Sequence, residues 1–185
     1  MAIKALVLDR DGTLNVEGPT EGGYVTKPED LKLYDGVADV LAGLRRRGVG
    51  LYVFTQQSCI AKGLLTEDGL ASIHTHMQTL LGQGYVDGFY HCPHGAADAC
   101  HCRKPMPGML VDIMQQHRLK GSEVAVIGDS LRDWQAAHAI GVPFAFVRTG
   151  KGAMLEASAV APQASFFDTL AEAVDFFLPE GEKKS

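Results

Sequence analysis

Short apolar runs alternate along this chain with segments whose apolar residues recur every three or four positions. The runs have the length of buried strands, and the spaced segments fit helices with one apolar face. The apolar positions of residues 37–47, for example, share one helical face, and Gly48 ends that segment. The pattern predicts strands at 3–8, 49–54, 86–90, 124–127 and 144–147, and helices at 37–47, 66–81, 109–117, 131–140 and from Asp168 to about 177.

Strands that alternate with helices indicate a parallel sheet covered by helices on both faces. We therefore predict an α/β, Rossmann-like doubly wound fold, in which ligands bind beyond the carboxyl ends of the strands. The length of 185 residues suits one domain, which we assign to residues 1–180, with a frayed tail at 181–185. Residues 15–34 lack periodicity and contain several Gly and Pro, so we expect a small flap over the site.

The composition restricts the expected partners and location. Apolar residues make up 46% and charged residues 21%, as in ordinary globular proteins, and the net charge of −5 provides no general basic field for nucleic acid. We find no apolar stretch of membrane-spanning length and no N-terminal signal peptide. We therefore expect a cytoplasmic monomer that binds neither nucleic acid nor membranes.

Two carboxylates, Asp9 and Asp11, directly follow the first apolar run on a turn that contains Gly12. Residues two apart on a strand share a face, so both carboxylates can face one pocket. Such a pair suits covalent catalysis, in which one carboxylate attacks and the other transfers protons. The alternative is a strand that ends in a solvated acidic turn.

Further polar residues are predicted at the same edge of the sheet. Thr55 follows the second strand, and its hydroxyl and the nearby backbone N–H groups can hold a phosphate oxygen. Lys104 precedes a helix, and Asp129 ends the fourth strand with Asp133 one helical turn later. Several carboxylates in one pocket repel each other and a phosphate. Mg²⁺ relieves this repulsion because it binds carboxylates, water and phosphate oxygens together.

The expected magnesium ligands are the carboxylates of Asp9 and Asp129 and the backbone carbonyl of Asp11. Phosphoryl transfer depends mainly on positioning and on electrostatic stabilisation, and these residues supply both. We expect Asp9 to form an aspartyl-phosphate, and Asp11 to protonate the leaving group and then activate water. Thr55 and Lys104 complete the predicted catalytic set.

Three of the four cysteines lie in one short segment together with His94. Cys92 and His94 form one pair, and Cys100 and Cys102 form a second pair after five intervening residues. Three thiolates and one imidazole make a tetrahedral zinc set that leaves no open position, so the predicted site is structural. The alternatives are a disulfide or unrelated free thiols.

The neighbours of these predicted zinc ligands raise two further questions. His91 and His101 compete with His94 as ligands, but the pairing of Cys-x-His with Cys-x-Cys favours His94, and we interpret the other two as ordinary polar residues. Arg103 and Lys104 follow the last ligand, so zinc would place two cations at the site. Arg103 can bind a second phosphate of the substrate or be a solvated residue at the rim.

These motifs in this order resemble the haloacid dehalogenase superfamily of phosphatases over nearly the whole chain. The match comprises the Asp-x-Asp-Gly-Thr of residues 9–13, then Thr55, Lys104 and the Gly-Asp-x-x-x-Asp of residues 128–133. The resemblance implies a Mg²⁺-dependent phosphomonoester hydrolase. The alternative is a non-catalytic sheet with acidic turns that coincide by chance.

The zinc segment narrows the resemblance to two phosphatase groups, which act on D-glycero-D-manno-heptose 1,7-bisphosphate and on histidinol phosphate. Residues 60–63 and 102–109 look like the heptose group. That resemblance implies removal of the C7 phosphate of a sugar bisphosphate, giving heptose 1-phosphate for lipopolysaccharide biosynthesis. We assign no role to Cys59 and interpret His74 as a surface or helix-packing residue.

The chain departs from the heptose pattern at three positions: Gln56 replaces the usual Asn, Lys62 the usual Arg, and Asp35 the usual Pro. An Asn at position 56 could donate a hydrogen bond to the nucleophile or to a substrate oxygen. We therefore expect Gln56 to contact the substrate, and its replacement by Asn to raise kcat modestly. A histidinol-phosphate phosphatase would need a spare acidic group such as Glu17 or Glu21. A catalytically weak phosphate-ligand sensor or scaffold is a third alternative, supported by Gln56 alone.

Overall fold

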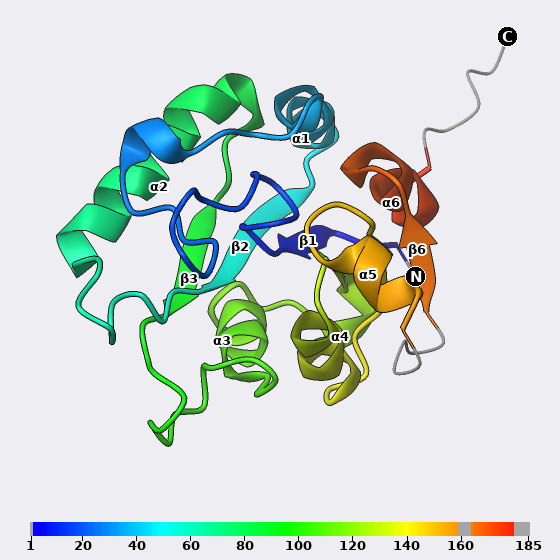
Figure 1. Ribbon diagram of the computed structural model, residues 1–185. Coiled ribbons are helices and arrows are strands. Elements are labelled where there is room, and N and C mark those ends of the chain that lie inside the picture. The colour runs from blue at the N-terminus through cyan, green and yellow to red at the C-terminus, as the bar shows by residue number, and fades with distance from the viewer. Residues whose placement is uncertain (1, 159–163, 180–185) are drawn as a thin grey trace, which may run out of the picture.

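The computed structural model describes residues 2–158 and 164–179, so the predicted tail at 181–185 lies outside the described residues. The strands in these ranges are β1 (Ala5–Leu8), β2 (Gly50–Gln56), β3 (Gly88–Cys92), β4 (Val124–Gly128), β5 (Phe144–Val147) and β6 (Ser165–Phe167). They form one sheet in the order β3-β2-β1-β4-β5-β6, and every neighbouring pair is parallel (Figure 1). The predicted Rossmann-like α/β fold is confirmed.

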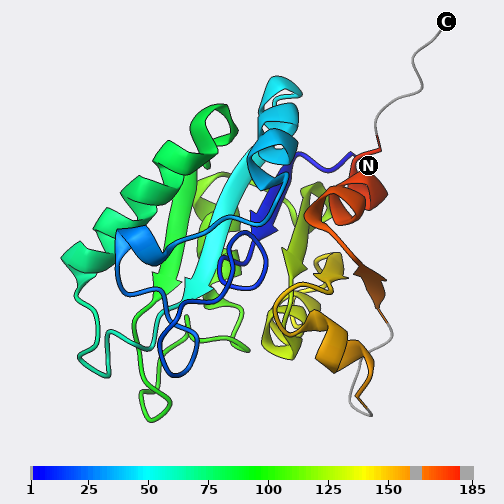
Figure 2. The same ribbon diagram turned by 45° about the horizontal axis from the view of Figure 1, so that its top comes forward.

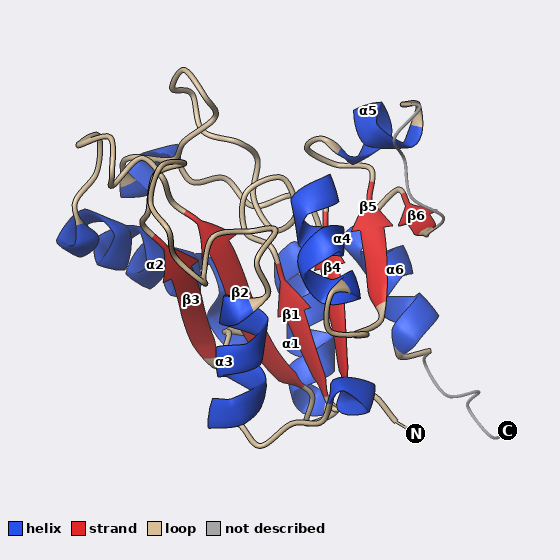
Figure 3. Ribbon diagram, turned by 90° about the horizontal axis from the view of Figure 1, so that it is seen from below, coloured by secondary structure: helices blue, strands red, loops and turns tan. Residues whose placement is uncertain are grey.

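Helices cover both faces of this sheet. They are α1 (Val37–Arg46), α2 (Glu67–Leu81), α3 (Gly108–Gln116), α4 (Leu131–His138), α5 (Gly152–Glu156) and α6 (Leu170–Phe177), with 3₁₀ turns at Pro28–Asp30, Gly82–Gly84 and Gly121–Glu123. Figure 3 shows α3 and α4 on one face of the sheet and α1, α2 and α6 on the other. Among the described residues, no helix has both the length and the apolar character needed to cross a membrane.

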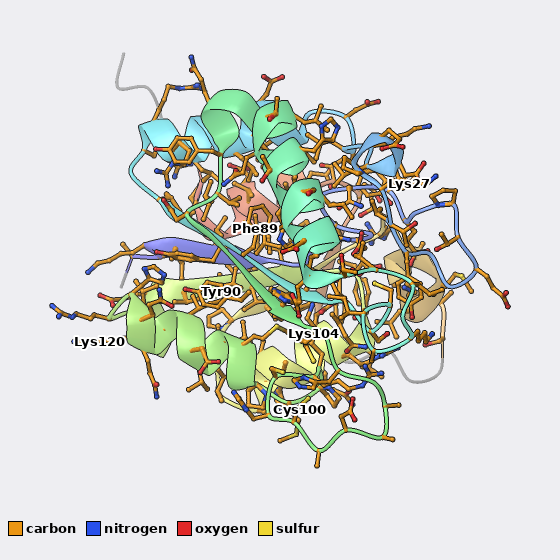
Figure 4. The ribbon with its side chains drawn as sticks, turned by 90° about the vertical axis from the view of Figure 1, so that its left-hand side faces the viewer. Lys27, Phe89, Tyr90, Cys100, Lys104 and Lys120 are labelled. Carbon is orange, nitrogen blue, oxygen red and sulfur yellow. The ribbon has the colours of Figure 1, made fainter. Side chains whose placement is uncertain are left out.

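Alternate residues of each strand supply two separate hydrophobic cores. The even-numbered residues of β1 pack with α1, α2 and α6, and its odd-numbered residues pack with α3 and α4. Figure 4 shows the same division at β3, where Phe89 lies on the α2 side and Tyr90 on the α3 side. Burial on both faces explains why the central strands are continuous apolar runs and do not alternate with polar residues.

Two elements were not predicted from the pattern. β6 has 3 residues and α5 has 5 residues, too few for a recognisable period. The start of the last helix is also corrected. Its capping residue is Thr169, whose hydroxyl accepts a hydrogen bond from the first turn of α6, and the predicted cap Asp168 pairs with Arg148 at 2.9 Å.

The limits of two strands differ from the prediction in a way that affects the site. β2 extends to Gln56 and β3 extends to Cys92, each two residues past the predicted end. Thr55 and Gln56 are therefore the last two residues of β2. Their side chains point to opposite faces of the sheet, as those of consecutive strand residues do. Figure 2 shows the loop between β1 and α1, in blue, at the end of the sheet to which the strand arrows point.

Candidate active site

The carboxyl ends of β1, β2 and β4 meet beside a cavity of about 350 Å³. β1 pairs with β2 on one side and with β4 on the other, so residues at the ends of these three strands become neighbours. Asp9 follows β1, Thr55 lies near the end of β2, and Asp129 follows β4. The cavity brings together the predicted catalytic and substrate-binding residues, since its lining includes Asp9, Asp11, Thr55, Gln56, Arg103, Lys104 and Asp129.

Lys104 is a buried cation at the centre of this group. Its Nζ donates to Oδ1 of Asp9 at 2.8 Å and to Oδ1 of Asp133 at 2.6 Å, and it lies 3.6 Å from the centroid of the Phe54 ring. Burial alone would lower the pKa of Lys104, but the Asp133 and Asp9 carboxylates more than offset this and raise it. Lys104 is therefore a charged link between the end of β1 and α4.

Asp133, one helical turn after Asp129, binds both Lys104 and the start of α4. Its Oδ2 accepts hydrogen bonds from the backbone N–H and the hydroxyl of Ser130, at 3.0 and 2.6 Å, and its Oδ1 accepts from Lys104. This is a capping box at the start of α4. Both oxygens are thus engaged, so Asp133 positions Lys104. The Ser-x-x-Asp sequence was the signal for this cap.

Asp129 carries a buried oxygen that suits a cation. Its Oδ1 has no hydrogen-bond partner among the described residues. A Cβ added at Gly12 would lie 2.3 Å from the other oxygen, so this turn needs glycine. Burial and the nearby Asp133 raise the pKa of Asp129 to about 7, and the same two causes raise the pKa of Asp9. An unpartnered carboxylate oxygen among crowded carboxylates fits a divalent cation.

The carboxylate of Asp11 is held on several sides. Arg10 donates to both of its oxygens, and Asn15 and Gln57 each donate one hydrogen bond at 2.9 Å. Burial would raise the pKa of Asp11, but the Arg10 charge and these hydrogen bonds hold it below its ordinary value. Gln57, for which we predicted no role, also donates to the Thr55 hydroxyl at 2.8 Å.

Gln56 has different contacts from those expected. With its amide oxygen facing Arg103, it accepts from the two guanidinium nitrogens at 3.0 and 3.2 Å, and its amide nitrogen donates to the backbone carbonyl of Lys104 at 3.3 Å. Arg103 in turn donates to the carbonyl of His94 at 2.9 Å. Gln56 thus orients Arg103 at the cavity, and no hydrogen bond joins Gln56 to Asp9 among the described residues.

These contacts reverse the result expected for Gln56→Asn. The shorter side chain loses reach to the guanidinium, so KM should rise about threefold to tenfold with little change in kcat, as for the loss of one hydrogen bond of about 1 kcal/mol. Steady-state kinetics measures this. The same substitution in an Arg103→Ala background is the control, because it should have no further effect if Gln56 acts through Arg103. A rise in kcat would restore the original expectation.

The four predicted zinc ligands lie together after β3. Their ligand atoms are all within 4.8 Å of one another. The Sγ atoms of Cys92 and Cys100 are 3.8 Å apart, and Nδ1 of His94 lies 3.5 Å from Cys92 Sγ and 3.2 Å from Cys102 Sγ. Two thiolates of a tetrahedral zinc site lie about 3.8 Å apart, so the donor set and spacing fit Zn²⁺. Figure 4 shows this loop around Cys100.

The two competing histidines lie outside this cluster. His91 pairs with Glu67 at 2.8 Å, and His101 lies 3.6 Å from Asp112. His94 is therefore the histidine that the structure places among the cysteines. The fourth cysteine, Cys59, is fully buried in the core that α1, α2 and α6 cover, and it is not part of this cluster.

The predicted flap borders the cavity and is fastened at two points. Tyr24 shares hydrogen bonds with Lys62 at 2.9 Å and with Ser58 at 3.0 Å, and Glu17 pairs with Lys151. The hydrogen bonds from Lys62 and Ser58 lower the pKa of the Tyr24 hydroxyl. All five residues line the cavity, so the flap forms one wall of the site.

The fold and the site define a hydrolase of the HAD-like class, and comparison with known proteins agrees. The HAD-hydrolase-like family model matches residues 101–173. D-glycero-beta-D-manno-heptose-1,7-bisphosphate 7-phosphatases from Neisseria meningitidis and Pseudomonas putida are 39% and 35% identical to the chain. These matches cover 81% of this chain and 80% of the first relative, and 91% of this chain and 96% of the second.

A solved structure gives the same assignment. It is D,D-heptose 1,7-bisphosphate phosphatase from B. bronchiseptica in complex with magnesium and phosphate. It has a TM-score of 0.88 and 35% identity, with 95% of this chain and 98% of that chain covered. The chain belongs to the D-glycero-beta-D-manno-heptose-1,7-bisphosphate 7-phosphatase family.

Proposed function

We propose that this chain is a Mg²⁺-dependent phosphatase that removes the C7 phosphate of D-glycero-D-manno-heptose 1,7-bisphosphate. The observation that carries the proposal is the buried group of Asp9, Lys104 and Asp133 beside the unpartnered oxygen of Asp129. It lies at the carboxyl edge of the sheet in a chain whose relatives bear that name. The product would be heptose 1-phosphate, for lipopolysaccharide biosynthesis.

In the proposed mechanism, Asp9 attacks phosphorus and forms an aspartyl-phosphate. Lys104 holds the attacking carboxylate in place and offsets its charge, and Asp133 holds Lys104. Asp11 must bind a proton before the leaving group departs, although Arg10 holds its pKa low. It gives that proton to the departing sugar oxygen and then takes a proton from the water that hydrolyses the intermediate. The Thr55 hydroxyl would bind a phosphoryl oxygen.

The two metals would have separate roles. The carboxylates of Asp9 and Asp129, with the backbone carbonyl of Asp11, would hold Mg²⁺, which offsets charge on the phosphoryl oxygens when bound. The Cys92, His94, Cys100 and Cys102 cluster would hold a structural Zn²⁺, which fixes the loop that leads to Arg103 and Lys104.

The rim of the cavity favours a bisphosphate over histidinol phosphate. Arg103 and Lys62 line it and can meet a second phosphate. Glu17, one of the acidic groups that a cationic substrate would need, is already paired with Lys151. The monomeric state and the cytoplasmic location remain predictions.

A phosphate-release panel with Mg²⁺ tests this substrate. Heptose 1,7-bisphosphate should give a higher kcat/KM than histidinol phosphate, because its second phosphate matches the cationic rim. It should also exceed fructose bisphosphate, because the relatives of this chain are named for the heptose. A higher value for histidinol phosphate would favour that alternative. Absence of turnover even with an aryl phosphate would favour the sensor or scaffold.

A further inference from the structure

Arg10 is a fully buried arginine between the two carboxylates of the first turn. Its Nη2 donates to both oxygens of Asp11, at 3.0 and 2.9 Å, and its Nε donates to Oδ1 at 3.3 Å. Its side chain therefore acts on Asp11, and only its backbone N–H contacts Asp9, at 2.8 Å. The orientation of Asp11 depends on where this guanidinium is held.

The other end of the guanidinium is held by His74, which lies on α2, far from Arg10 in the sequence. Nη1 of Arg10 and Nε2 of His74 are 3.3 Å apart. Arginine can only donate, so Nε2 must accept and the ring must be neutral, with its proton on Nδ1. Burial, followed by the charge of Arg10, lowers the pKa of His74 to about 3, which keeps the ring in that form.

The His74 ring is itself fixed by packing. It is 8% exposed and stacks on the Phe89 ring of β3, with centroids 4.1 Å apart and planes 9° from parallel. The ring therefore has little freedom to turn away from Arg10. A chain of contacts thus runs from a rigid helix and strand, through a neutral imidazole and a guanidinium, to the Asp11 carboxylate.

We propose that His74 is a positioning residue for Asp11, acting through Arg10. This inference rests on the proposed function, because it takes Asp11 to be the acid that protonates the leaving oxygen. Without the His74 acceptor, a buried N–H of Arg10 has no hydrogen-bond partner. The guanidinium then turns toward another acceptor, and its hydrogen bonds to the Asp11 carboxylate change in geometry. His74 does not line the cavity, so it would act on the reaction only through Arg10.

Two substrates separate a positioning role from a purely structural one. A sugar alkoxide needs a proton to depart, whereas 4-nitrophenolate departs as an anion and depends little on a general acid. The parameter is kcat/KM with Mg²⁺, because it covers the steps through leaving-group departure and omits later hydrolysis of the aspartyl-phosphate. Heptose 1,7-bisphosphate and 4-nitrophenyl phosphate are the two probes.

His74→Phe keeps a ring on Phe89 but removes the acceptor. We expect kcat/KM to fall about tenfold or more for heptose 1,7-bisphosphate, which is part of the about 10²–10⁴-fold that a general acid contributes, and less than threefold for 4-nitrophenyl phosphate. His74→Gln places an amide near the position of Nε2 and should recover the sugar substrate to within about threefold of wild type. His76→Gln, on the same helix, is the control and should match wild type.

Arg10→Lys is the second variant, in case the ring replacement does not fold. It keeps the charge but loses the two-pronged contact with Asp11, so it should show the same selective loss. Equal losses on both substrates, or no loss in either variant, would overturn the positioning role. Wild-type protein that hydrolyses the aryl phosphate but no sugar phosphate would overturn the proposed substrate alone. Wild-type protein inactive on both would overturn the proposed function and this inference with it.

Discussion

Asp9→Asn should lower kcat by at least about 10³-fold, because the amide cannot attack phosphorus whereas the remaining residues can still bind substrate. Its carbonyl oxygen can still accept from Lys104, so the fold should persist. Steady-state phosphate release measures the loss, and thermal unfolding together with binding of inorganic phosphate in Mg²⁺ measures what is retained.

The matched control is Asp35→Asn, which makes the same chemical change at an exposed position outside the cavity. This variant should keep the wild-type rate. If purified Asp9→Asn protein hydrolyses substrate at a near wild-type rate, Asp9 is not the nucleophile and the aspartyl-phosphate mechanism is wrong.

Loss of the zinc site should have the second largest effect. Wild-type protein should contain one zinc per chain, and Cys100→Ser should contain none. Structural zinc contributes on the order of 10 kcal/mol to folding of small sites. Loss of only part of this stabilisation should therefore lower Tm by about 10 °C. Activity should fall as well, because the same loop carries Arg103 and Lys104. Elemental analysis and calorimetry measure both changes.

Cys59→Ser is the matched control for this experiment, because Cys59 lies outside the cluster. It should keep its zinc whatever its effect on stability. Wild-type protein that is free of metal at the cysteine cluster and fully active would refute the zinc proposal.

The sheet was predictable because its central strands are buried on both faces and are bounded by glycines and helices of clear period. The predicted active-site residues come from the ends of those strands, so placing the strands also placed Asp9 and Asp129. β6 and α5 were not predicted, because elements of so few residues show no recognisable periodicity. The end of β2 was placed two residues early because Thr55 and Gln56 are polar.

Contacts between side chains were much less predictable. Nothing in the local sequence indicates that Arg10 is buried or that His74 faces it, since the two residues meet only when α2 packs on the sheet. The neighbouring Gln56 and Gln57 are chemically identical, yet one contacts Arg103 and the other Asp11. Which glutamine contacts which residue depends on the path of the backbone at the end of β2. The sequence pattern does not determine that path.

The central place of β1 also has a consequence for the order in which the protein acquires activity. Ala5 pairs with Gly50 and with Val124, 45 and 119 positions later in the chain. Pairings over such separations form slowly, because a long loop must close before they contribute. The nucleophile is thus synthesised well before Asp129 and Asp133, which follow β4 in the chain. Recovery of activity during refolding would therefore report the docking of β4, not the collapse of the first half of the chain.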